Sequence, residues 1–209
     1  MDDIAVFAAR APVIPVLTVD RASDAAPLAR ALVNGGLPVI EITLRTAAAL
    51  EALRRIAAEV PEAIVGAGTV LNAGQLAAAK QAGARFAVSP GCTPALVRAA
   101  RESGCAYLPG VQTVSEAMAL CEQGFRLLKF FPADASGGVG WLKAVAAPLA
   151  GIDFCPTGGI DAVTAPVFLA LPNVACVGGS WVAPHDAIAA GDWAKIERLA
   201  AAAADLRRR

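Results

Sequence analysis

Eight short apolar runs recur along the chain with their ends about 23 residues apart, and each is followed by a loop and a helical pattern. The runs cover residues 13–18, 39–44, 63–68, 86–89, 106–109, 126–131, 153–156 and 174–178. A strand followed by a helix, repeated eight times, predicts an α/β fold, namely a (β/α)8 TIM barrel with parallel strands inside and helices outside. A short helix over residues 3–10 is expected to cover the bottom of this barrel. Because no linker or low-complexity stretch interrupts the series, residues 1–209 are predicted to form one domain.

Short-range sequence signals predict where several helices start. Thr93 stands before a proline, which suits the cap and first position of a helix. Thr113 and Glu116 have the spacing of a capping box. A short helix is expected over residues 72–81, and Thr46 is expected to cap the helix after the second strand.

Charge and cysteine content exclude several classes of protein. Lys plus Arg equal Asp plus Glu at 18 each, which argues against a nucleic-acid or membrane surface as the main partner. The hydrophobic fraction is 56%, yet every apolar run is shorter than a membrane span. The first residues lack the features of a signal peptide, so a cytoplasmic location is expected. Free buried thiols are expected at all five cysteines, Cys92, Cys105, Cys121, Cys155 and Cys176.

Lys129 stands within the large apolar residues of the run 126–131, just before Pro132. This pattern predicts a buried strand that carries one amine near its end. Burial disfavours the charged ammonium and favours the neutral, nucleophilic amine, so Lys129 is a candidate for Schiff-base chemistry. The alternative is a lysine at a strand end whose head reaches water.

Other polar residues also gather where the predicted strands end. Glu41 and Arg45 bracket the end of the second strand, Thr69 follows the third, and Pro90 follows the fourth. Glu41, Thr43 and Arg45 alternate, so we expect all three to point to one side. An inward carboxylate and guanidinium are costly unless they bind something. A structural ion pair between Glu41 and Arg45 is the alternative interpretation.

Two glycine clusters follow the seventh and eighth predicted strands. They are Thr157-Gly158-Gly159 and Gly178-Gly179-Ser180. Glycines let backbone N–H groups approach an anion, and these two loops are where many barrels hold a phosphate. The alternative is that the glycines only form turns.

Taken in order, these motifs resemble those of the KDPG/KHG aldolase family. The resemblance covers nearly the whole chain through residues 41–46, 65–70, 89–91, 128–133, 155–160 and 177–181. It implies a class I aldolase that cleaves 2-dehydro-3-deoxy-6-phosphogluconate to pyruvate and glyceraldehyde 3-phosphate. It also implies cleavage of 4-hydroxy-2-oxoglutarate to pyruvate and glyoxylate.

The resemblance further implies a role for each candidate residue. Lys129 would form the Schiff base, Glu41 would be the general acid/base, and Arg45 with Thr69 would hold the pyruvyl carboxylate. Thr157 would bond the substrate. An apolar wall would come from Phe131 and Pro90, and a phosphate site from Gly158, Gly159, Gly179 and Ser180. Such enzymes need no cofactor or metal and are commonly homotrimers. Cys92 and residues 134–136 depart mildly from the family pattern.

Three alternatives remain at this level. An aldolase for the C4-epimeric galactonate substrate would keep the same lysine and carboxylate. A metal-dependent aldolase is disfavoured because the sole histidine, His185, is expected to lie far from the strand ends. A non-catalytic barrel that binds phosphorylated sugars would have no need of a buried amine beside a carboxylate.

Overall fold

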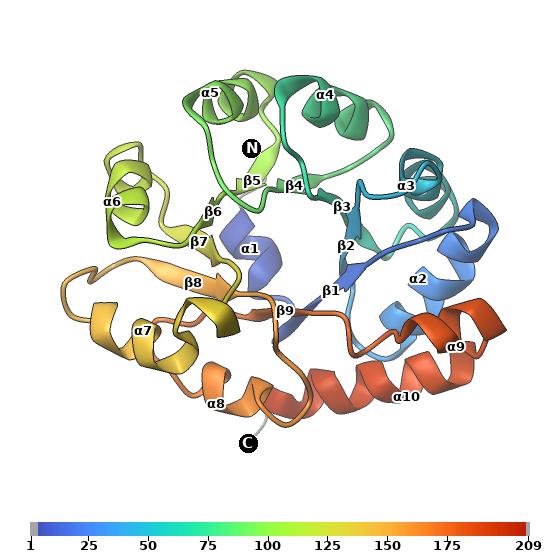
Figure 1. Ribbon diagram of the computed structural model, residues 1–209. Coiled ribbons are helices and arrows are strands. Elements are labelled where there is room, and N and C mark those ends of the chain that lie inside the picture. Colours follow the sequence, from blue (N-terminus) through green and yellow to red (C-terminus); the bar gives the residue numbers. More distant parts are fainter. Residues whose placement is uncertain (1–3, 208–209) are drawn as a thin grey trace.

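The computed structural model describes residues 4–207 and contains a curled parallel sheet with helices outside it (Figure 1). The strands are β1 (Val13–Leu17), β2 (Val39–Thr43), β3 (Ile64–Gly68), β4 (Phe86–Val88), β5 (Ala106–Leu108), β6 (Gly110–Val111), β7 (Leu127–Phe130), β8 (Asp153–Pro156) and β9 (Val177–Gly179). The helices are α1 (Ile4–Ala8), α2 (Ala25–Asn34), α3 (Ala49–Glu59), α4 (Ala73–Gln81), α5 (Pro94–Ser103), α6 (Val114–Glu122), α7 (Gly138–Val145), α8 (Ala165–Leu169), α9 (His185–Ala190) and α10 (Trp193–Ala204). Short 3-10 turns cover Ala22–Asp24, Asp134–Ser136 and Asp205–Arg207.

The strands hydrogen-bond in two parallel groups. Six of them pair in the order β5-β4-β3-β2-β1-β9, and three pair in the order β6-β7-β8. The prediction of a single strand over 106–109 was incomplete, because the chain extends through Pro109 into β6. Pro109 has no N–H to donate, but its carbonyl accepts from Lys129 N at 2.9 Å. The last predicted run, 174–178, was placed too early, because β9 spans Val177–Gly179.

Side chains close the end at which the strands begin. Phe7 of α1 packs there with Phe86 of β4, the ring centroids being 6.0 Å apart. The remaining members of this buried cluster come from α1 and from the strands or the residues beside them: Ile4, Ala8, Ile14, Val39, Ile64, Val88, Ala106, Leu108, Leu127, Cys155 and Cys176. The predicted bottom helix is confirmed over Ile4–Ala8, while residue 3 lies outside the described residues. Polar groups are left to the opposite end.

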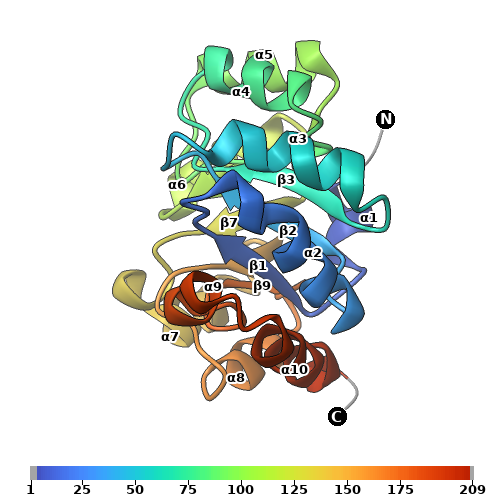
Figure 2. The ribbon, with the colours of Figure 1, turned by 90° about the vertical axis from the view of Figure 1, so that its right-hand side faces the viewer.

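A second, larger core lies between the sheet and the outer helices. On one side of the molecule, α2 packs between α3 and α10 (Figures 1 and 2). Three predicted helix starts are confirmed by side chains that cap backbone N–H groups: Asn72, Thr93 and Thr113. The predicted cap at Thr46 is wrong, since α3 has Ala48 at that position. Within residues 4–207, no helix is both long and apolar enough to cross a membrane.

Candidate active site

A buried amine and a buried carboxylate face each other across the sheet. Lys129 lies on β7 and Glu41 on β2, and Lys129 Nζ is 3.5 Å from Glu41 Oε1. The two residues are only 5% and 3% exposed, so the interpretation of Lys129 as a head that reaches water is wrong. Burying two charged groups is costly unless they pair or act on a ligand. Glu41 Oε1 accepts no hydrogen bond within residues 4–207, so it keeps acceptor capacity beside the amine.

The space for the Glu41 carboxylate is provided by a glycine on the neighbouring strand. In the register of β2 and β3, Thr43 lies opposite Gly68. A Cβ atom at Gly68 would lie 2.0 Å from Glu41 Oε1 and 2.5 Å from its Cγ. No side chain can therefore stand at position 68 while Glu41 keeps this position.

Arg45 lies beyond the end of β2, in a turn, and its side chain is exposed. The predicted alternation holds for Glu41 and Thr43, which are buried, but not as far as Arg45. Its Nη2 donates to Thr18 Oγ1 at 2.9 Å. Glu41 pairs with Lys129 rather than with Arg45. Thr18 follows β1 and was not predicted as a site residue, because only the fold brings it beside Arg45.

Thr69 and Pro90 follow β3 and β4 at the same end of the sheet as Lys129 and Glu41. Thr69 is the one non-glycine residue within 4–207 with a positive φ, 57°, which places it directly after Gly68 in a left-handed turn. Pro90 lies against β6, since a Cβ atom at Gly110 would be 2.3 Å from the Pro90 carbonyl oxygen. Gly110 pairs with Lys129, so Pro90 lies close to the strand of the amine.

A hydroxyl cluster that the sequence did not indicate lies behind Pro90. Ser89 Oγ is 2.5 Å from Tyr107 Oη, and Tyr107 Oη donates to Cys92 Sγ at 3.5 Å. Burial, more than these contacts, raises the pKa of Tyr107, so its phenol stays protonated and can donate. Burial likewise raises the pKa of the Cys92 thiol. Cys92 is therefore held as a neutral thiol rather than as a nucleophile.

The two glycine clusters lie side by side beyond β8 and at β9. Thr157 forms a bridge with Gly178, and its buried hydroxyl donates to Cys155 O at 3.4 Å. Gly158 and Gly159 have φ values of 100° and 78°, a conformation that glycine adopts without strain.

Phe131 links the first of these loops to the amine. A Cβ atom at Gly158 would lie 3.3 Å from the Phe131 ring, and the centroid of that ring is 5.2 Å from Lys129 Nζ. In the second glycine cluster, Gly179 is buried and Ser180 is exposed. The fold thus places the predicted residues at one end of the sheet, with Thr157 and the glycine loops beside Phe131.

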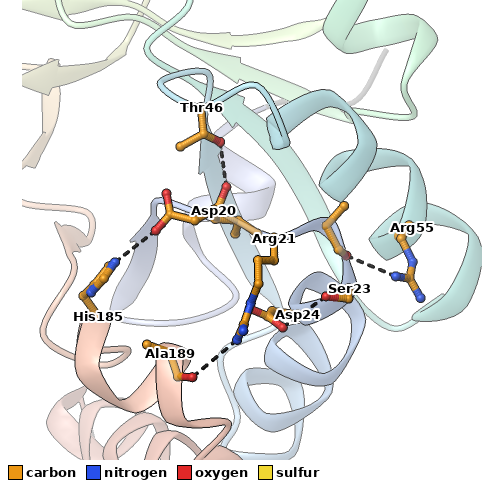
Figure 3. Close-up of polar contacts among 10 residues, drawn as sticks. Asp20, Arg21, Ser23, Asp24, Thr46, Arg55, His185 and Ala189 are labelled. Carbon is orange, nitrogen blue, oxygen red and sulfur yellow. Dashed lines mark hydrogen bonds and ion pairs between the residues drawn. The ribbon is translucent and has the colours of Figure 1, made fainter.

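His185 lies nearer to this end of the sheet than the sequence suggested. Its Nε2 is 3.0 Å from Asp20 Oδ2, and Asp20 follows β1 after Thr18 and Val19 (Figure 3). Both side chains are largely exposed, and their contacts are with each other rather than with Lys129 or Glu41. Among residues 4–207, no group of three His, Cys, Asp or Glu side chains gathers closely enough to hold a metal ion.

Comparison with known proteins decides the family. Residues 4–199 match the family model described as KDPG and KHG aldolase. The chain belongs to this aldolase family. The 2-dehydro-3-deoxy-phosphogluconate aldolase of Pseudoalteromonas atlantica is 53% identical to this aldolase over 90% of the chain and 88% of the relative. The KHG/KDPG aldolase of Escherichia coli K12 is also 53% identical, over 90% of the chain and 89% of the relative.

Solved structures agree with this assignment. The KDPG aldolase from Legionella pneumophila, with pyruvate captured as a covalent carbinolamine, has a TM-score of 0.95 to this aldolase. It is 44% identical, with 97% of this chain and 98% of that chain covered. The 2-keto-3-deoxy-6-phosphogluconate aldolase of Zymomonas mobilis ZM4 with 3-phosphoglycerate has a TM-score of 0.92 at 47% identity, covering 98% and 96%.

Proposed function

We propose that the protein is a class I aldolase that reversibly cleaves 2-dehydro-3-deoxy-6-phosphogluconate to pyruvate and glyceraldehyde 3-phosphate. The observation that carries this proposal is the buried Lys129 amine, 3.5 Å from the Glu41 carboxylate at the carboxyl end of parallel strands. Relatives at 53% identity bear the names 2-dehydro-3-deoxy-phosphogluconate aldolase and KHG/KDPG aldolase. The second name supports 4-hydroxy-2-oxoglutarate as a further substrate, which would give pyruvate and glyoxylate.

In the first half of the reaction, Lys129 Nζ attacks the C2 carbonyl and forms a carbinolamine. Loss of water gives a protonated imine that accepts the electron pair of the breaking C3–C4 bond. Glu41 takes the proton of the C4 hydroxyl as that bond breaks, which releases glyceraldehyde 3-phosphate and leaves an enamine. Glu41 Oε1 lies 3.5 Å from Lys129 Nζ and accepts no hydrogen bond within the described residues, which supports this assignment.

In the second half, Glu41 returns its proton to C3 of the enamine, and the imine forms again. Water then attacks the imine carbon, which frees pyruvate and Lys129. The same carboxylate serves as base and as acid, so the proton that it takes from the C4 hydroxyl is the one that it gives to C3. The closeness of amine and carboxylate supports a single shuttle of this kind.

Binding roles go to the loops around this pair. Arg45 and Thr69 would hold the pyruvyl carboxylate, since a guanidinium fork matches a carboxylate. Thr157 would bond the substrate, and Phe131 with Pro90 would form the apolar wall. Two of the glycines proposed for the phosphate site have the left-handed backbone that turns successive N–H groups toward an anion, which supports it. The phosphate site would consist of Gly158, Gly159, Gly179 and Ser180.

We further propose that the strands close into an eight-stranded barrel in one domain, with β5 and β6 forming one strand interrupted at Pro109. The bond from Lys129 N to Pro109 O and the bridge between Thr157 and Gly178 support closure where the two groups of strands meet. Family membership supports a cytoplasmic homotrimer, and exposed apolar side chains are available for contacts between copies, with Val163 81% and Val167 54% exposed. Light scattering of the purified protein tests the trimer.

Reductive trapping tests the function directly. The protein is incubated with pyruvate and borohydride, and the site of the added mass is mapped among its lysines, Lys80, Lys129, Lys143 and Lys195. We expect a single reduced adduct on Lys129 and none in Lys129→Ala, which should also lose turnover. Lys143→Ala, on an exposed face of α7, is the matched control and should be labelled normally. An adduct elsewhere, or normal turnover of Lys129→Ala, contradicts the proposal.

Glu41→Gln separates proton transfer from imine formation. We expect kcat to fall about 10²–10⁴-fold, the usual size of a general acid/base contribution, while trapping with pyruvate at Lys129 persists. A normal rate would remove Glu41 from this role.

If wild-type protein binds phosphorylated sugars without turning them over, the chain is a binding barrel instead. Rates on the two C4 epimers test substrate preference; the native KDPGal structure is only 26% identical, which favours the gluconate substrate.

A further inference from the structure

A directed chain of hydrogen bonds leads from Arg45 back to the backbone of β1. Arg45 Nη2 donates to Thr18 Oγ1 at 2.9 Å, and Thr18 Oγ1 is 3.3 Å from Thr43 Oγ1. Thr43 Oγ1 in turn donates to the carbonyl oxygen of Leu17 at 2.8 Å. The chain therefore ties an exposed side chain beyond β2 to the end of β1.

The direction of each bond follows from counting protons. A hydroxyl has one proton to donate, and the proton of Thr43 goes to Leu17 O. Thr43 must therefore accept from Thr18, so the proton of Thr18 is used and its oxygen is left to accept from Arg45. Because a guanidinium can only donate, the chain fits only in this order.

Pairing of β1 with β2 fixes the position of Thr18. Val16 lies opposite Glu41 and Leu17 opposite Ile42, so the next residues along, Thr18 and Thr43, are neighbours. Thr43 is buried, and the β-branched side chain of Thr18 has few χ1 rotamers, so the acceptor for Arg45 is rigid. Arg45 itself lies in a turn and is exposed, where a free arginine would sample many rotamers.

We infer that Thr18 is a positioning residue that orients the Arg45 guanidinium for the carboxylate of the substrate. This inference rests on the proposed function, in which Arg45 holds that carboxylate. The bond to Thr18 uses one of the five guanidinium N–H donors, which leaves the planar fork able to bind a carboxylate through two others. Holding the arginine in place beforehand reduces the rotamer freedom that substrate binding must remove.

The test compares two ligands of Lys129 that differ in the carboxylate. Pyruvate and acetone both form imines that borohydride traps, but only pyruvate has a group for Arg45. For Thr18→Val, which keeps the shape and removes the hydroxyl, we expect the half-saturating pyruvate concentration to rise about tenfold. The half-saturating acetone concentration should stay unchanged. The KM for the sugar acid should rise similarly with little change in kcat.

Further variants sharpen this test. Thr18→Ser keeps the hydroxyl and should restore pyruvate binding to near the wild-type value. Thr46→Val removes a neighbouring hydroxyl that donates to Val19 O at 2.6 Å rather than to Arg45, and it is the matched control (Figure 3). In an Arg45→Ala background, Thr18→Val should have no further effect on pyruvate binding. Thr18→Ala gives the same comparison if the valine variant loses its fold.

Two results would overturn the inference. One is a half-saturating pyruvate concentration for Thr18→Val equal to that of the wild type, when the wild-type protein is labelled at Lys129. The other is an equal loss for pyruvate and acetone, which would show that Thr18 acts on the site as a whole. If the wild-type protein itself fails to label at Lys129, the proposed function has failed instead, so the two failures are distinguishable.

Discussion

At the scale of single residues, Gly68 is as restricted as the residues that we propose to contact the substrate. The side chain of Glu41 fills the space where a Cβ atom at Gly68 would stand, 2.0 Å from Oε1. Even the smallest substitution must therefore displace the Glu41 side chain from its observed position. The constraint comes from the chemistry of a neighbouring strand rather than from the conformation of Gly68 itself.

Gly68→Ala should lower kcat by about 10²-fold or more, because Glu41 would lose the position beside Lys129 that the proposed proton transfers need. Labelling by pyruvate and borohydride should persist. A coupled assay that detects pyruvate released from the sugar acid measures kcat. Gly140→Ala is the control, since a Cβ atom there meets nothing within 4 Å, and its kcat should equal that of the wild type. A kcat for Gly68→Ala close to the wild-type value would show that Glu41 has room to move.

Several residues of the site could be found from sequence, and others could not. Lys129 was identifiable because one charged residue within an apolar strand is conspicuous, and its burial is confirmed. Thr18 and Tyr107 carry no such signal, since a threonine at a strand end and a tyrosine in a strand are ordinary. Their importance comes from partners distant in sequence, Arg45 for one and Ser89 for the other.

At the scale of elements, helix α6 begins with a charged cap. Glu116 Oε2 accepts from Gln112 N and Thr113 N, both at 2.8 Å, while Glu116 N donates to Thr113 Oγ1 at 3.3 Å. The hydrogen bond from Gln112 N–H, followed by those from Thr113, lowers the pKa of Glu116, although burial opposes the change. A carboxyl with a lowered pKa in the folded state stabilises the fold above its unfolded pKa, and this contribution is lost as pH falls through the folded value.

Glu116→Gln should therefore lower the Tm by about 1–3 °C at pH 7. The difference from the wild type should shrink as pH falls below about 4.3, the ordinary pKa of a glutamate. Thermal melts over a series of pH values measure it. Glu122→Gln, at the last residue of the same helix, is the charge-matched control and should not lower the Tm. A gap for Glu116→Gln that stays constant down to pH 2 would contradict this assignment.

Local signals predicted local elements well and failed where a distant group competed. The capping box of α6 was readable because both partners lie within four residues of sequence. Thr46 has the same local potential, yet its hydroxyl donates to Val19 O of another loop, and α3 begins later. The eighth predicted run, 174–178, was placed too early for a similar reason. Val174 forms an isolated bridge with Phe154 of β8, and β9 begins only at Val177.

At the scale of the whole molecule, helix α1 and the candidate active site lie at opposite ends of the strands. Repetition of strand and helix predicted the parallel sheet and its outer helices, since each unit repeats the same pattern. The division of the sheet at Pro109 could not be predicted, because it depends on long-range strand pairing. β5 pairs with β4, whereas β6 pairs with β7. Within the cluster around α1, Ile4, Phe7 and Ala8 pack at the end at which the strands begin, and the cluster reaches along the strands as far as Cys155, which lies opposite Lys129.

Phe7→Ala should destabilise the protein by about 3–5 kcal/mol, because Phe7 is 3% exposed and packs against Phe86. The Tm should fall by about 10 °C. At 25 °C, kcat should not change as long as the protein stays folded. Thermal melting and steady-state rates on the same samples measure both. Val6→Ala should change the Tm little, because Val6 of the same helix is 55% exposed. If Phe7→Ala changed the Tm as little as Val6→Ala does, α1 would not be part of the core.

The two glycines of β3 leave the strand with different freedom to change over evolution. At Gly66, a Cβ atom would lie 2.5 Å from the Phe86 ring, so a smaller residue at 86 would make room for a larger one at 66. We expect these two positions to vary together among homologues, with a larger residue at position 66 accompanied by a smaller one at position 86. Gly68 has no such exchange, because its neighbour is the carboxylate of Glu41, which the proposed reaction cannot replace. Position 68 should therefore stay glycine for as long as the chemistry is kept.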